Sequence, residues 1–273
     1  LHRLRLQGLR IAFFLRSNSN LYEQIDNLMV SFRYYDLMTP LEDSITDLNA
    51  FLPHIVVGPP LLLSMLAQKR QKGELKIAPK RLISVAETLE AQDRTYIENI
   101  FQVLVEQIYQ STEGLIAATC AHGSLHIQED IVAVQCIPIN DSQTSATEKA
   151  RVTPIVTDLW RTTQPIIRYR LNDILQLGDS CVCGSSFRVI QTIEGRCDDI
   201  CYFISSQGER PFFPDTIRRM ILLSDNAIED YQAVQERPGH LRVNLQVNSD
   251  LFADVAVAVK NSINSVIAQY GCQ

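Results

Sequence analysis

The sequence has 273 residues, of which 46% are hydrophobic and 21% charged, and its formal net charge is −6. This length and composition are typical of one large or two modest globular domains. The negative net charge and the lack of a long basic run argue against a surface for nucleic acid or for an anionic membrane. Apolar stretches such as residues 61–67 are too short to span a bilayer.

The cysteines and the first residues bear on the compartment. Seven cysteines, an odd number in a chain of this size, argue against a disulfide scaffold and favour a reducing compartment, the cytoplasm. Arg3, Arg5 and Arg10 precede only a brief apolar run without a small-residue cleavage site, so no signal peptide is predicted. The chain starts at Leu1 rather than Met, which indicates a processed protein or a fragment.

The first third of the chain alternates predicted strands and helices. Strands are expected at 9–15, 30–35, 54–57 and 81–86, and helices at 21–28, 41–51, 61–71 and 90–101. Another β-type run follows at 103–109. Such alternation predicts an α/β fold, with parallel strands joined by helical crossovers.

After residue 113 the pattern changes to short strands, which predict an antiparallel β subdomain. These strands are expected at 115–118, 124–127, 131–137, 165–170, 174–177 and 187–196, and the polar segment 141–149 is a predicted hairpin tip or loop. A small unit follows, with strands at 200–204, 227–235 and 241–247 and helices at 214–223 and 251–269. We therefore predict a large domain over 1–197, α/β to about 113 and β-rich over 114–197, and a small α+β C-terminal domain over 198–273.

Residues 109–114, Tyr-Gln-Ser-Thr-Glu-Gly, are the most informative stretch, because they follow the end of a predicted strand. Open α/β sheets bind ligands at the carboxyl ends of their strands. A hydroxyl and backbone N–H groups suit phosphate oxygens, and a carboxylate suits Mg²⁺. The alternative is a turn that only ends the strand.

Two further segments carry carboxylates at predicted boundaries. Asp173 ends the run Tyr-Arg-Leu-Asn-Asp at 169–173, and a carboxylate at such a turn is able to accept two hydrogen bonds from a ribose diol. An ordinary turn aspartate is the alternative. The run Gly-Arg-Cys-Asp-Asp at 195–199 directly precedes the small C-terminal unit, which favours a hinge over a plain polar linker.

Four residues with metal-binding side chains form another pattern. Cys181 and Cys183 belong to a Cys-Val-Cys-Gly knuckle, and Cys120 and His126 lie upstream with five residues between them. Three thiolates and one imidazole make a closed tetrahedral zinc site. Alternatives stay open, because the spacing is not that of a standard zinc finger, buried free cysteines are common, and His122 is a rival ligand to His126.

In this order, the segments 109–114, 169–173 and 195–199 resemble three signature motifs of the adenylate-forming ligase superfamily. The chain most resembles the branch that contains phenylacetate–coenzyme A ligase and the deazaflavin-coenzyme synthetases. The run 165–170 matches this branch, and the Cys, Leu-His and Cys-x-Cys-Gly pattern recurs in it. The resemblance begins near Leu9 and corresponds to the later two-thirds of a full ligase.

The resemblance implies a role for each motif residue. Tyr109 would flank the adenine, Thr112 would contact the α-phosphate and Glu113 would bind Mg²⁺. The remaining implied roles are ribose binding by Asp173, nucleotide contact by Arg196, the pivot of a mobile C-terminal lid at Asp198, and lining of the nucleotide pocket by Ala86 and Glu87.

The implied reaction is ATP-dependent activation of a carboxylic acid, by analogy an aromatic one, as an acyl-adenylate. Transfer to coenzyme A or another nucleophile would follow. Gln110, Leu171 and Asn172 depart from the motifs, and the family's phosphate loop and terminal lysine are not found in these 273 residues. The alternative is therefore a non-catalytic, zinc-braced nucleotide-binding or interaction module. The sequence does not indicate the acid, the acceptor or the oligomeric state.

Overall fold

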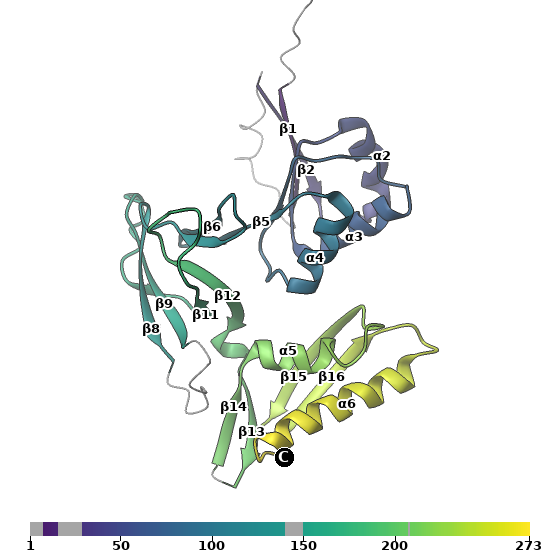
Figure 1. The fold of residues 1–273 in the computed structure, drawn as a ribbon, viewed down its shortest axis with the longest axis vertical. Helices are drawn as coiled ribbons and strands as arrows, with labels where there is room; N and C mark the ends of the chain where they lie inside the picture. The colour runs from purple at the N-terminus through teal and green to yellow at the C-terminus, as the bar shows by residue number, and fades with distance from the viewer. Residues whose placement is uncertain (1–7, 16–28, 140–149, 207) are drawn as a thin grey trace, which may run out of the picture. The chain divides into compact units, whose positions relative to one another are not determined.

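The computed structural model describes residues 8–15, 29–139, 150–206 and 208–273 (Figure 1). The chain divides into two compact units. The first comprises residues 1–135, 155–169 and 177–191, and the second comprises 136–154, 170–176 and 192–273. In the described part of the chain, the helices are too short or too polar for one of them to cross a membrane.

The first unit is built on a parallel sheet with strand order β2-β1-β3-β4-β5. Its strands are β1 (Leu9–Leu15), β2 (Val30–Asp36), β3 (Ile55–Gly58), β4 (Arg81–Ser84) and β5 (Val105–Ser111). The crossover helices are α2 (Leu41–Phe51), α3 (Pro60–Gln71) and α4 (Ala91–Phe101).

All three helices cover the same face of this sheet (Figure 1). The crossovers from β2 to β3, β3 to β4 and β4 to β5 move in one direction across the sheet, and such crossovers are right-handed. The helices bury Leu48, Leu63 and Ile97 against Val56 and Leu82 of the strands, each with 0% of its surface exposed. This core holds the carboxyl ends of β3, β4 and β5 along one edge.

The sheet continues in the first unit with antiparallel strands, in the order β5-β6-β7-β12. The strands of the β-rich part are β6 (Gly114–Thr119), β7 (Leu125–Ile127), β8 (Val132–Pro138), β9 (Arg151–Asp158), β10 (Tyr169–Arg170), β11 (Asp173–Leu177) and β12 (Val189–Arg196). In the second unit, β11 pairs with β9 through Leu175 and Val152.

The end of the chain forms an α+β arrangement within the second unit. After the short 3-10 helix η1 (Cys197–Asp199) come β13 (Cys201–Ser205), β14 (Gly208–Phe212), α5 (Pro214–Leu222), β15 (Asp230–Arg237), β16 (His240–Gln246) and α6 (Phe252–Gln269). Val255, Val259 and Ile263 of α6 pack in one core with Ile221 of α5 and Phe203 of β13. Cys272 forms an isolated antiparallel β-bridge with Ser205, so the end of the chain pairs with the edge of β13.

The fold class predicted from the sequence is confirmed. Two strands were not predicted, and one predicted strand is much shorter. β9 was not predicted because Pro154 interrupts its pattern, and β14 was not predicted because Gly208, Glu209 and Pro211 are poor strand formers. The predicted strand 165–170 is reduced to β10, because Arg168 has a left-handed φ of 49°.

The small unit therefore has the order β-β-α-β-β-α rather than β-α-β-β-α. β4 also ends at Ser84, two residues before the predicted end. The predicted helix 21–28 and the polar loop 141–149 lie outside the described residues. The domain boundary between residues 197 and 198 stays a prediction.

Candidate functional site

Thr112 and Glu113 form the two-residue turn of the hairpin between β5 and β6, because Ser111 pairs with Gly114. A register shift between Tyr109 and Gln110 marks a bulge just before the turn. Bulges of this kind re-aim side chains next to binding sites. The exposed Thr112 hydroxyl and the half-buried Glu113 carboxylate thus stand side by side at the end of a parallel strand.

Contacts from a distant loop hold this turn. The carbonyl of Thr112 accepts a hydrogen bond of 2.9 Å from Nη1 of Arg161. Gly114 has a φ of +142°, and a Cβ there would lie 2.9 Å from Oδ2 of Asp158. Glycine is therefore required at the position that follows the turn.

A cavity of about 380 Å³ opens beside the hairpin. Its walls are Gln110, Ser111, Thr112, Gly114, Leu115, Ile131, Asp158, Trp160 and Arg161. The N–H groups of Trp160 and Arg161 donate to Asp158 and hold the pKa of this carboxyl below its usual value. The cavity thus offers hydroxyls, a guanidinium and the flat ring of Trp160, 73% exposed, to a small polar ligand.

Ala86 and Glu87 follow the neighbouring strand, β4, whose last residue pairs with Gln107 of β5. Ala86 has a φ of +70°, and the N–H of Glu87 bonds to the carbonyl of Val85 at 2.9 Å, so the three residues form a γ-turn. Such backbone strain in a residue with a side chain is concentrated at binding sites. The structure therefore brings Ala86 and Glu87 to the same sheet edge as Tyr109 to Glu113.

The other predicted nucleotide residues lie in the second unit. Asp173 begins β11, Arg196 ends β12 and Asp198 belongs to η1. The N–H of Cys197 donates to the carbonyl of Asn172 at 2.7 Å, and the Asn172 amide donates to Oδ2 of Asp198. Oδ2 of Asp198 also lies 3.7 Å from Nη2 of Arg196. The turn before Asp173 and the predicted hinge are thus joined.

The charged groups around this junction affect the pKa of the Cys197 thiol. Burial is the largest cause of its raised pKa. Arg170 opposes the shift, whereas Asp198 and Asp173 add to it. Both carboxylates are therefore close enough to act on one side chain, and the thiol stays protonated at neutral pH.

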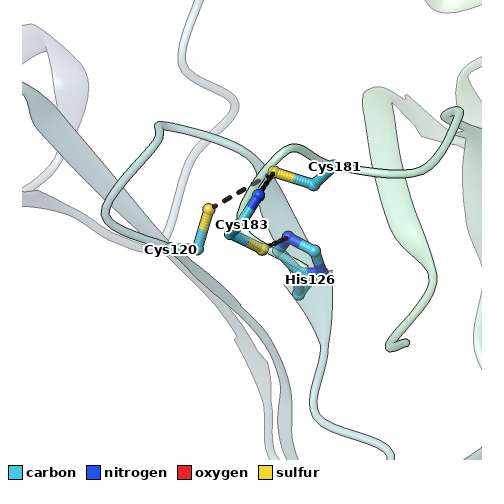
Figure 2. Close-up of side chains that lie close together, drawn as sticks. All are labelled: Cys120, His126, Cys181 and Cys183. Atoms are coloured by element: carbon cyan, nitrogen blue, oxygen red, sulfur yellow. Dashed lines mark hydrogen bonds between the residues drawn. The ribbon is translucent and has the colours of Figure 1, made fainter. Parts of the chain in front are cut away.

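The four predicted metal ligands Cys120, His126, Cys181 and Cys183 come together in the first unit, with their ligand atoms all within 4.8 Å of one another (Figure 2). Sγ of Cys120 lies 3.8 Å from Sγ of Cys181, and Sγ of Cys183 lies 3.4 Å from Nε2 of His126. A tetrahedral zinc site with ordinary bond lengths has S–S edges of about 3.8 Å and S–N edges of about 3.6 Å. The cluster therefore fits zinc.

The surroundings of the cluster prepare it for a metal. Nδ1 of His126 lies 3.0 Å from the carbonyl of Phe187, which leaves Nε2 facing the thiols. A hydrogen bond from Ser124 is the largest cause that lowers the pKa of Cys181 to about 6, and this shift favours the thiolate form that binds metals. The rival His122 is exposed, and the cluster contains His126 instead.

The loop that holds the hairpin turn was not predicted from the sequence. Asp158 ends β9, and its Oδ1 accepts the N–H groups of Trp160 and Arg161, both at 2.8 Å. An aspartate that accepts N–H groups two and three residues later is an Asx-turn, which its residue type permits but does not require. The reach of Arg161 back to Thr112, 49 residues away, left no signal in the local pattern.

One curated protein and several solved structures are similar to the chain. No protein-family model matches the chain. Protein CapK of Staphylococcus aureus is 26% identical over 231 residues, a match that covers 83% of this chain and 49% of CapK. The chain thus spans about half the length of this curated relative.

Solved structures of acyl-adenylate enzymes are similar across most of the chain. A 2-hydroxyisobutyryl-CoA ligase in complex with R3-HIB-AMP has a TM-score of 0.69 at 17% identity, over 93% of this chain and 57% of the ligase. The anthranilate CoA ligase AuaEII with anthranoyl-AMP has a TM-score of 0.61 at 10% identity, over 94% of this chain and 54% of the ligase. The adenylation domain of a Mycobacterium chelonae carboxylate reductase has a TM-score of 0.59 at 13% identity, over 90% of this chain and 43% of that domain. The chain therefore has the fold of the adenylate-forming CoA ligases.

Proposed function

We propose that this chain is part of an adenylate-forming ligase. The reaction would join a carboxylic acid to ATP, form an acyl-adenylate and release pyrophosphate, and then pass the acyl group to the thiol of coenzyme A or to another nucleophile. The observation that carries this proposal is the Thr112–Glu113 turn at the carboxyl edge of the sheet, beside the strained turn at Ala86. The fold shared with CoA ligases supports it.

At this edge each side chain has a chemical task in the proposal. The ring of Tyr109 would stack against adenine, and the hydroxyl of Thr112 would donate to the α-phosphate. The carboxylate of Glu113 would hold Mg²⁺, which neutralises phosphate charge during transfer. Ala86 and Glu87, both exposed and outside the walls of the 380 Å³ cavity, would line the adenine side of the nucleotide site.

The predicted nucleotide residues of the second unit have tasks of their own in the proposal. Asp173 would accept two hydrogen bonds from the ribose, and Arg196, 62% exposed, would contact the nucleotide. Asp198 would be the pivot on which the C-terminal domain turns between adenylation and thioester formation. Its side chain is 69% exposed and bonded to Asn172.

We place the chain in the phenylacetate–coenzyme A ligase-like branch, on the strength of the Cys/His cluster. Zinc bound by Cys120, His126, Cys181 and Cys183 would be structural, because four protein ligands leave no position for substrate. An aromatic acid and a cytoplasmic location are further proposals. The odd number of cysteines, seven, suits a reducing compartment.

Two measurements test the proposal. Calorimetric titration with ATP·Mg²⁺ is expected to show saturable binding that is lost in Asp173→Ala and kept in Asp179→Ala, an exposed carboxylate six residues later. Exchange of labelled pyrophosphate into ATP, with the complete protein and a panel of carboxylic acids, tests the chemistry. An absence of exchange with every acid would leave the catalytic proposal without support.

A second candidate is a non-catalytic module braced by zinc. The cluster is compatible with it, because its four ligand atoms come together without any nucleotide. Departures from the ligase motifs at Gln110, Leu171 and Asn172 point the same way. One zinc per chain together with no ATP binding would select this candidate.

A further inference from the structure

The peptide group between Thr112 and Glu113 is held on both sides. Its carbonyl, that of Thr112, accepts a hydrogen bond of 2.9 Å from Nη1 of Arg161. Its N–H, that of Glu113, donates to Oγ of Ser111 at 3.3 Å. The central peptide group of a two-residue turn has two orientations that differ by about 180°, and these separate one turn type from the next. A bond to the carbonyl selects one orientation.

Arg161 is itself held in place by Asp158. Its Nε lies 3.9 Å from Oδ2 of Asp158, and its backbone N–H donates to Oδ1 of the same residue at 2.8 Å. The Asp158 carboxylate also lies against the hairpin, since a Cβ at Gly114 would be 2.9 Å from Oδ2. The Asp158 carboxylate thus contacts Arg161 and also lies against the hairpin at Gly114.

The exposure of this pair is low enough for it to hold a defined geometry. The side chain of Arg161 is 33% exposed and that of Asp158 is 17% exposed. Solvent therefore screens their attraction only in part. Both residues line the 380 Å³ cavity together with Thr112. The Thr112–Glu113 peptide group would therefore have a fixed orientation before a ligand enters the cavity.

We propose that Arg161, held by Asp158, is a positioning residue that selects the orientation of the Thr112–Glu113 peptide group. The proposal rests on the proposed function, because that orientation then decides whether the Thr112 hydroxyl and the Glu113 carboxylate face the phosphates and Mg²⁺. Adenine and ribose contacts at Tyr109 and Asp173 do not depend on it. Arg161 would therefore act on phosphate and metal recognition alone.

The test compares two ligands in the same variant. Arg161→Ala is expected to weaken ATP·Mg²⁺ binding about tenfold, the effect of losing one hydrogen bond from a charged group, and to leave adenosine binding unchanged. Arg161→Lys keeps one donor and is expected to restore part of the loss. Both affinities are measured by calorimetry on the full chain.

Arg188→Ala is the matched control. Arg188 makes the same two kinds of contact in the same unit, with the carboxylate of Glu129 and the carbonyl of Val134, and neither partner belongs to the turn. It is expected to leave both affinities unchanged. Equal weakening of adenosine and ATP·Mg²⁺ by Arg161→Ala, or no change in either, would overturn the positioning role.

The proposed function is judged separately by the wild-type protein. If the wild type binds neither ligand, the nucleotide site is refuted, and the ligand-free amide resonances of Glu113 and Gly114 decide the positioning role. These resonances are expected to move in Arg161→Ala and to stay in Arg188→Ala. Resonances that stay in place in Arg161→Ala would show that Arg161 does not set the turn.

Discussion

Glu194 and Arg151 form a buried ion pair in the second unit. Nε of Arg151 lies 2.8 Å and 3.0 Å from the two carboxylate oxygens of Glu194, whose side chain is 1% exposed. The amide of Gln176 also donates to this carboxylate, and the Arg151 guanidinium lies 4.4 Å from the ring centre of Phe213. Buried charges are tolerated when they are paired and hydrogen-bonded in this way.

Removal of one charge is therefore expected to be costly. Glu194→Gln leaves the Arg151 guanidinium buried beside a neutral amide, and we expect the free energy of unfolding to fall by about 3–5 kcal/mol. Urea unfolding of the variant measures the loss. Glu236→Gln breaks an exposed pair with Arg242 and is expected to change stability by less than about 1 kcal/mol. Equal effects in the two variants would show that burial does not matter here.

Gly195 permits a close approach just before the predicted hinge. Its φ is +128°, and a Cβ there would lie 2.9 Å from Cβ of Pro214, the first residue of α5. Gly195→Ala is expected to lower the melting temperature through both backbone strain and the clash. Gly208→Ala is the control, because Gly208 has a φ of +108° and open space around it. If Gly195→Ala melts at as high a temperature as Gly208→Ala, the contact with Pro214 is easily relaxed.

Zinc is expected at one atom per chain by metal analysis of the purified protein. Cys183→Ser should reduce this to near zero and destabilise the first unit, because structural zinc contributes directly to folding. Cys136→Ser is the control, since Cys136 lies outside the cluster. Full zinc content in Cys183→Ser would contradict the proposed ligand set.

Asp158 is expected to make the first unit sensitive to acid. Its pKa is lowered by N–H donors from Trp160 and Arg161, so it contributes stability that is present above the unfolded pKa of about 3.9 and is lost as pH falls through the lower folded value. Asp158→Asn should therefore lower stability at pH 7 and flatten its decline below about pH 4. Urea unfolding at several pH values checks this. Asp250→Asn, an exposed carboxylate, should leave the pH profile unchanged.

Elements with strong local patterns were predicted closely. α2 spans residues 41–51 as predicted, because Pro40 precedes it and Leu52 ends it with a left-handed φ of 49°. Arg168 and Ala86 also have positive φ, but neither residue type indicates it. Tertiary packing imposes those two conformations, which is why the strand predicted at 165–170 is mostly absent and β4 ends early.

The candidate site was predictable where residue type alone carries the chemistry. The Thr112–Glu113 pair and the four residues of the Cys/His cluster were visible in the sequence. His126 was preferred to its rival His122, but the sequence left both open, because the choice depends on the burial of His126 on β7, with 3% exposed. Arg161 was invisible for a similar reason, since only the folded chain brings its long side chain back to the hairpin.

The Cys/His cluster also constrains the order of events during synthesis. Cys120 and Cys181 are 61 residues apart in the chain. At ribosomal rates of roughly 5–20 residues per second, the first two ligands emerge several seconds before the second two. During that interval a zinc ion would find only one of the three thiols of the cluster, together with the imidazoles of His122 and His126, so the cluster is still incomplete. If the cluster binds zinc, the supply of zinc would therefore affect the yield of folded protein while the β-rich part is still being synthesised.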